Sequence, residues 1–139
     1  MKEWIAVLRT FDLELAASGN PDIQAIRGRL SAGVQAVADS VDFILRTAGK
    51  DPNAAFAGAV PFLKLMGIVA GGWQMARAAL ICENKLSNKE SDPEFCAAKI
   101  LTARFFGDHV LSQAQGLAAT VASGAHAVMA LTDEQFLAA

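Results

Sequence analysis

Apolar side chains recur at helical spacing through the first third of the chain. Between residues 2 and 17 they are separated by four, three and four positions: Trp4, Leu8, Phe11 and Leu15. Between residues 21 and 48 the spacing of three or four continues: Ile23, Ile26, Leu30, Val34, Val37, Val41 and Ile44. Residues three or four apart share one face of an α-helix, so both segments are predicted to be amphipathic helices.

Capping residues mark where these helices begin and end. Asn20 is predicted to be the N-cap of the second helix, with Pro21 at its first helical position. Gly49 is expected at the C′ position after that helix. Asp51 is then expected to cap a third helix, immediately before Pro52.

The third helix is expected from about residue 52 to about residue 84. Pro61 removes a backbone donor within it, which predicts a kink or a break near residues 57–60. Three glycines lie in its middle: Gly67, Gly71 and Gly72. Each is disfavoured in a helix relative to alanine by up to about 1 kcal/mol. We therefore interpret them as positions where a neighbouring backbone comes close.

The second half of the chain predicts further helices with short connections. The polar segment 84–93 is expected to be a loop, followed by a fourth helix from about residue 92. A fifth helix is expected over residues 112–130, and Thr132 with Gln135 indicates a capping box for a short terminal turn. Together these elements predict an all-α fold, an antiparallel up-and-down helical bundle of four main helices plus an extra C-terminal helix.

Composition supports one apolar, helical domain spanning residues 1–139. Hydrophobic residues make up 53% of the 139 residues and charged residues 19%, which excludes intrinsic disorder as the main state. The 28 alanines, together with the absence of tyrosine, favour closely packed helices over sheet. The formal net charge of −2 provides no electrostatic attraction for nucleic acid, so no nucleic-acid partner is expected.

The cysteines and the apolar stretches indicate whether the protein is cytoplasmic, secreted or embedded in a membrane. Cys82 and Cys96 lack the spacing of a disulfide or zinc motif, so they are interpreted as reduced core thiols of a cytoplasmic protein. The N-terminus does not resemble a signal peptide. Residues 54–82 are strongly apolar but interrupted by Lys64 and Arg77, which predicts a buried helix and no membrane partner.

No arrangement of residues predicts catalysis or metal binding. Asp108 and His109 are adjacent, but neighbouring helical residues point about 100° apart and cannot act as an orienting pair. Asp108 is better placed to meet Arg104 one turn earlier. A nucleophile motif is absent, and neither HxxxH nor ExxH spacing occurs. His109 and His126 are therefore expected to have surface, interface or hydrogen-bonding roles.

Two long stretches carry almost no formal charge. No Lys, Arg, Asp or Glu lies between His109 and Thr132, and Lys64 is alone between Pro52 and Ala76. Exposed helices normally carry charges on their outer face. We therefore expect the fourth and fifth helices to dock on another subunit or a neighbouring domain. The alternative is a monomer whose outer face consists of Ser, Gln, Thr and Ala.

Three segments resemble a known family. They are Gly67 to Leu80 (GIVAGGWQMARAAL), Ala97 to Leu111 (AAKILTARFFGDHVL) and Gly124 to Leu131 (GAHAVMAL). In this order they are similar to the C-terminal extension of long bacterial acyl-CoA dehydrogenases, in the methylmercaptopropionyl-CoA dehydrogenase-like branch. The resemblance covers nearly the whole chain; Ser112 departs from it, because proline is expected there.

The resemblance implies a non-catalytic domain at the C-terminal end of a longer chain. Such enzymes use FAD to remove hydrogens across the α–β bond of an acyl-CoA, with a glutamate as base. Their flavin-binding and catalytic regions lie upstream, so no catalytic, cofactor-binding or metal-binding residue is transferred to this chain. The implied partners are the upstream dehydrogenase domains or a second subunit. The helix-packing or interface candidates are Gly67, Gly71, Gly72, Trp73, Arg104, His109 and His126.

Two other functions remain open from the sequence. One is a free-standing helical-bundle interaction module that associates with itself. The other is a bundle that binds a small apolar ligand in a cavity lined by Phe62, Trp73 and Met75, although core packing is the preferred interpretation of these residues.

Overall fold

The computed structural model describes residues 1–89 and 92–138, and the regular structure in them is helical. The elements are α1 (Lys2–Ala16), α2 (Pro21–Thr47), α3 (Pro52–Ala57), α4 (Ala59–Asn88), α5 (Pro93–His109), the 3₁₀ turn η1 (Leu111–Gln113), α6 (Ala114–Ala122) and α7 (Asp133–Leu137). The predicted all-α class is confirmed.

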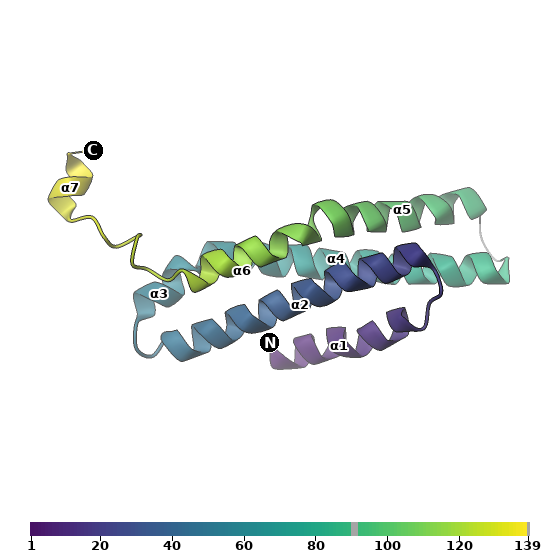
Figure 1. Cartoon of the computed structure of the whole chain (residues 1–139), viewed down its shortest axis with the longest axis horizontal. Helices are drawn as coiled ribbons and strands as arrows, with labels where there is room; N and C mark the ends of the chain where they lie inside the picture. The colour runs from purple at the N-terminus through teal and green to yellow at the C-terminus, as the bar shows by residue number, and fades with distance from the viewer. Residues whose placement is uncertain (90–91, 139) are drawn as a thin grey trace.

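The long helices lie side by side along one axis, and successive ones run in opposite directions (Figure 1). α2 and α4 form the centre, and α1 packs along α2. α5, η1 and α6 follow one another back over α2 and α4, and contact both. α4 is therefore in contact with several helices along its length, which explains why so few charged residues occur in it.

The core lies between α1, α2, α4, α5 and the η1–α6 segment. Its largest fully buried side chains are Leu8, Leu15, Ile23, Ile26, Leu65, Val37, Val69, Val121, Cys96 and Ser40. The hydroxyl of Ser40 donates a hydrogen bond of 2.8 Å to the carbonyl oxygen of Ala36, so this buried polar group is satisfied within its own helix. The core residues of α1 and α2 follow the predicted spacing, except that Ile5 is buried in place of Trp4 and Ile44 is only half-buried.

The predicted helix starts are confirmed by their caps. The side chain of Asn20 accepts from the Asp22 N–H at 2.9 Å, and the side chain of Asp51 accepts from the Ala54 N–H at 3.1 Å. Asp92 caps α5 in the same way. Each of the three caps is followed by proline, whose missing N–H costs nothing at the first helical position.

The break between α3 and α4 falls at Gly58, within the predicted interval 57–60. A Cβ on Gly58 would lie 3.2 Å from Cγ1 of Val121, on α6. The break therefore coincides with a close approach between the start of α4 and the end of α6.

Other boundaries differ from the prediction. The end of α2 agrees: α2 ends at Thr47 with Ala48 as its C-cap, which puts Gly49 at the predicted C′ position, without a left-handed conformation. The expected loop 84–93 is wrong for its first part, because α4 continues to Asn88 and Lys89 ends it at φ 57°. Residues 90 and 91 of that expected loop lie outside the described residues.

The predicted helix over residues 112–130 is confirmed for residues 114–122 and is wrong beyond them. The chain passes through η1 before α6, and α6 ends at Ala122. Gly124 then takes φ +68°, where its Cβ would lie 3.6 Å from that of Ala54. This left-handed turn beside α3 ends the helix. Beyond buried Ala125, the chain leaves the bundle and ends in α7, which carries the predicted capping box (Figure 1).

α4 is, among the described residues, the helix long and apolar enough to cross a membrane by length and composition. The interruptions at Lys64 and Arg77 therefore do not by themselves exclude a membrane span for this helix. The contacts of α4 with α2, α5 and α6 account for the same apolar composition within the bundle.

Candidate functional site

The glycines of α4 have three different surroundings. A Cβ on Gly72 would lie 2.6 Å from Cδ1 of buried Leu111, so the η1 turn rests directly on this position. A Cβ on Gly71 would lie 3.0 Å from Cζ of Phe106, the far end of a side chain that can shift. A Cβ on Gly67 would meet nothing within 4 Å. Gly72 and Gly71 therefore serve contacts inside the bundle, and the close approach expected at Gly67 is not found in the described residues.

Arg104 joins α5 to α2. Its Nε donates to Oδ2 of Asp108 at 2.6 Å, as the one-turn spacing predicted, and its Nη1 donates to Oδ1 of Asp22 at 3.2 Å. Arg29 of α2 also pairs with Asp108, at 3.4 Å. The hydrogen bond from Arg104 is the main cause that lowers the pKa of Asp108. This network holds α2 and α5 together. Because the carboxylates of Asp22 and Asp108 are paired with arginines, the network has a structural role.

The two histidines lie on the surface. His109 is exposed in the last turn of α5, where its ring lies against Phe105 with centroids 4.5 Å apart. Asp108 faces the arginines, so the adjacent pair does not form a catalytic dyad. His126 is exposed in the turn that follows Gly124.

Trp73 lies at the contact between α4 and α1. Its ring meets Trp4 edge to face at 6.5 Å, and the Arg77 guanidinium lies 5.4 Å from the ring centre. The Trp73 Nε1 is buried and has no hydrogen-bond partner among the described residues. Trp73 and Arg77 line an open hollow beside α1, but Phe62 and Met75 do not line it. The three residues of the apolar-ligand hypothesis thus do not share this hollow.

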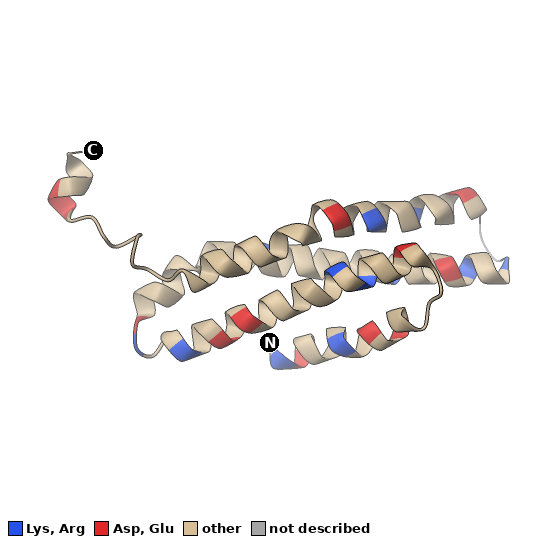
Figure 2. Ribbon diagram, viewed as in Figure 1, with Lys and Arg blue, Asp and Glu red and all other residues tan. Residues whose placement is uncertain are grey.

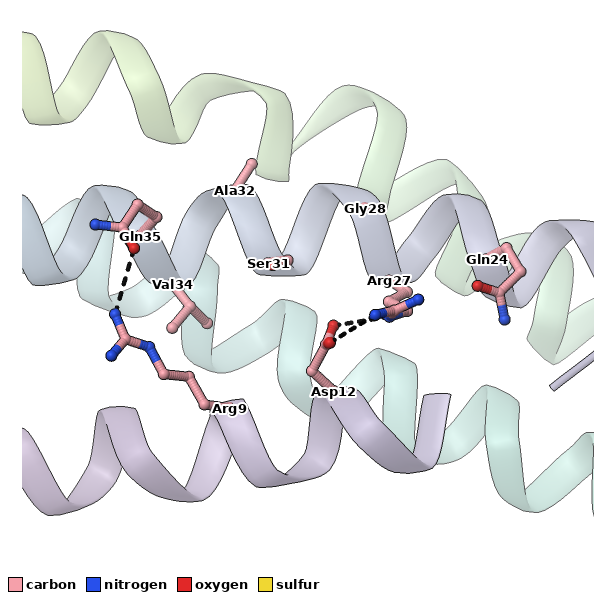
Figure 3. A pocket seen from close by; sticks show the side chains of 9 residues that line it. All are labelled: Arg9, Asp12, Gln24, Arg27, Gly28, Ser31, Ala32, Val34 and Gln35. Atoms are coloured by element: carbon pink, nitrogen blue, oxygen red, sulfur yellow. Dashed lines mark hydrogen bonds and ion pairs between the residues drawn. The ribbon is translucent and has the colours of Figure 1, made fainter. Parts of the chain in front are cut away.

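A second open groove, about 500 Å³ in volume, lies between α1 and α2. Its polar side chains pair across it (Figure 3): Arg27 forms two hydrogen bonds with Asp12, at 3.0 and 2.9 Å, and Arg9 donates to Gln35 at 3.3 Å. Because these arginines are engaged and the groove is open, its residues do not fit an enclosed site for a flavin.

Both thiols are buried where α4 meets α5. Cys82 is 6% exposed and Cys96 is fully buried. Burial raises the pKa of the Cys82 thiol, and the neighbouring Cys96 raises it further. Such thiols are poor nucleophiles and metal ligands. Among residues 1–89 and 92–138, no group of three His, Cys, Asp or Glu side chains could hold a metal ion.

The end of the bundle formed by α3, α6 and the first half of α4 is almost free of charge (Figure 2). Three large side chains are exposed there: Phe56 at 74%, Val60 at 77% and Leu63 at 73%. We call Phe56, Val60 and Leu63 the apolar stripe. The outer face of η1 and α6 instead presents small or neutral polar residues such as Ser112, Gln115 and Thr120.

The apolar stripe was not among the sequence candidates. Its spacing of four and three positions was visible, but the same spacing describes a core face. Two features of the sequence indicate that this face is not an ordinary core face: the interruption at Gly58 and the single charged residue, Lys64, that follows it. The chargeless stretches thus include a small, neutral face on α6, an exposed apolar face on α3 and α4, and exposed apolar residues after Ala125.

Comparison with known proteins identifies the family. Residues 1–132 match the family described as "Acetyl-CoA dehydrogenase C-terminal like". A segment of 95 residues is 46% identical to the 3-methylmercaptopropionyl-CoA dehydrogenase of Ruegeria pomeroyi, covering 68% of this chain but 16% of that protein. The chain thus corresponds to a small part of that relative's length. It belongs to the acetyl-CoA dehydrogenase C-terminal-like family, as its three motifs predicted.

Proposed function

We propose that this chain is the C-terminal helical domain of a longer acyl-CoA dehydrogenase-type flavoenzyme, and that it serves assembly, not chemistry. In this proposal, upstream domains bind FAD and dehydrogenate the α–β bond of an acyl-CoA. The proposal is supported by the family match and by the small share of the relative's length that the similar segment occupies.

The observation that carries the assembly role is the apolar stripe. Full burial of a Val, Leu or Phe side chain is worth about 1.5–3 kcal/mol, and these three side chains, one on α3 and two one turn apart on α4, are each about three-quarters exposed. α3, α6 and the first half of α4 carry almost no charge to hydrate it. Large apolar side chains exposed within one short segment are typical of an interaction surface. The stripe therefore packs against an upstream domain or another subunit.

The residues of this chain contribute binding and positioning in the proposed enzyme. Leu111 seated on Gly72, and the network around Arg104, fix α5 and η1 against α2 and α4. These contacts keep the bundle rigid, so the stripe is presented in one orientation. No chemical step is assigned to a residue of this chain.

The test uses the full-length polypeptide that carries this domain. Phe56, Val60 and Leu63 are replaced together by serine, and oligomeric mass, thermal stability and flavin content are measured. We expect a loss of subunits or a lower melting temperature of the dehydrogenase part, with activity per bound flavin retained in the protein that remains assembled. A matched control replaces Val7 and Leu13, which are exposed on α1, and should leave assembly unchanged. Unchanged mass and stability in the triple variant would contradict the assembly role.

A further inference from the structure

The segment after Ala125 carries a second apolar surface, separate from the bundle. We call residues 126–138 the arm; Figure 1 shows it extending away from the helices. Its large apolar side chains are exposed: Val128 69%, Met129 61%, Leu131 57%, Phe136 74% and Leu137 87%. α7 begins with a capping box between Thr132 and Gln135, whose partners both lie within the arm.

The base of the arm lies beside the apolar stripe. Gly58 separates Phe56 from Val60 along the chain, and its Cβ would lie 3.2 Å from Val121 in the last turns of α6. Residues 126–132 span at most roughly 25 Å when extended. Two copies related by a two-fold axis near this end can therefore each place α7 over the stripe of the other.

The charges of the two surfaces are complementary. Asp133 and Glu134 stand in the first turn of α7, and residues 126–138 include no Lys or Arg. The stripe is followed directly by exposed Lys64, the single charged residue between Pro52 and Ala76. Opposite charges at the rim of an apolar contact steer the partner and fix its register.

The available area is that of a stable dimer. The stripe and the arm together present eight large apolar side chains, each more than half exposed. With aromatic side chains of about 150–250 Å², these eight expose on the order of 1,000 Å² per copy. A reciprocal exchange would then bury at most about 2,000 Å² over two copies, within the range of standard protein–protein interfaces.

The geometry points to a second copy of this chain as the occupant of the apolar stripe: each copy lays its arm, through Phe136 and Leu137, across the stripe of the other, with Asp133 and Glu134 beside Lys64. This inference rests on the proposed role in assembly and names the partner.

Cross-linking between two distinguishable copies of the intact protein tests this. One tagged copy carries Val60→Cys and the other carries Phe136→Cys, so a disulfide between the new thiols joins two copies. We expect a disulfide-linked pair to form under mild oxidation. Lys64→Glu on the first copy should slow its formation at least about fivefold, and Asp133→Lys with Glu134→Lys on the second should restore the rate to within about twofold.

Lys2→Glu makes the same charge change at an exposed position of α1 and should leave the rate unchanged. A cross-link that forms when both new cysteines are on one copy, and not between copies, would show that the arm folds back on its own chain and would overturn the inference. Absence of either cross-link would also overturn it. If no cross-link forms between copies but the stripe is covered in the assembled protein, an upstream domain covers the stripe. In that case the further inference fails and the proposed function stands.

Discussion

Gly72 and Gly67 offer a matched pair of substitutions that tests how α4 contacts η1. Both glycines lie inside α4, so replacing either with alanine gains up to about 1 kcal/mol in helix propensity. At Gly67 the new methyl group meets nothing within 4 Å, and the full gain should be observed. At Gly72 the methyl group would lie 2.6 Å from Cδ1 and 2.9 Å from Cγ of Leu111.

The steric cost of Gly72→Ala follows from the burial of Leu111. This side chain is 3% exposed, and the contact involves its branching carbon as well as its end, so rotation alone does not relieve it. Overpacking of this kind costs about 1–3 kcal/mol. The gain in helix propensity is the same in both variants. The unfolding free energy of Gly72→Ala should therefore be lower than that of Gly67→Ala by the overpacking cost of about 1–3 kcal/mol. For a domain of this size, the difference corresponds to roughly 3–10 °C in melting temperature.

Thermal and urea unfolding followed by circular dichroism measure both variants. A third measurement places Gly72→Ala in a Leu111→Ala background, where the clash is absent and the substitution should become stabilising. The reasoning is refuted if Gly72→Ala stabilises the original protein as much as Gly67→Ala does, or if removing Leu111 leaves its effect unchanged.

Two further predictions concern the ion pairs and the thiols. Because pairing with Arg104 lowers the pKa of Asp108, its stabilisation is present above the ordinary carboxyl pKa of about 3.9 and is lost as pH falls through the lowered pKa. Arg104→Met should therefore lower the melting temperature at neutral pH and by progressively less below about pH 4; a pH-independent difference would refute this. Cys82 and Cys96 should react with a thiol reagent at the rate of unfolding, since both are buried; rapid labelling of the folded protein would contradict their placement.

Local signals explain which parts of the fold were predictable. The starts of α2, α3 and α5 each depend on an Asn or Asp side chain followed by proline, and these contacts lie within three residues of sequence. The end of α6 depends instead on Gly124 turning beside Ala54, a contact across 70 positions of sequence. Nothing in the alanine-rich sequence around Gly124 indicates that contact, so the helix was extended too far.

The difference between local contacts and contacts across the chain also decides which interaction candidates were predictable. Gly67 and Gly72 are the same residue type in one helix, and which of them meets a neighbour is decided by the rotation of α4 against η1. The Arg104–Asp108 pair was predictable because it spans one turn, whereas its partners on α2, Asp22 and Arg29, were not. The stripe was missed because apolar spacing predicts a helical face but does not reveal whether another helix covers it.

Thiol labelling at Val60 tests most directly whether the apolar stripe is an assembly surface. The two native thiols are buried, so a cysteine at Val60 reports on the stripe, and Ser112→Cys on the outer face of α6 serves as the exposed reference. In the full-length, assembled protein we predict that Val60→Cys reacts with a maleimide at least about tenfold more slowly than Ser112→Cys. Equal, rapid labelling at both positions would show that nothing covers the stripe and would contradict the assembly role.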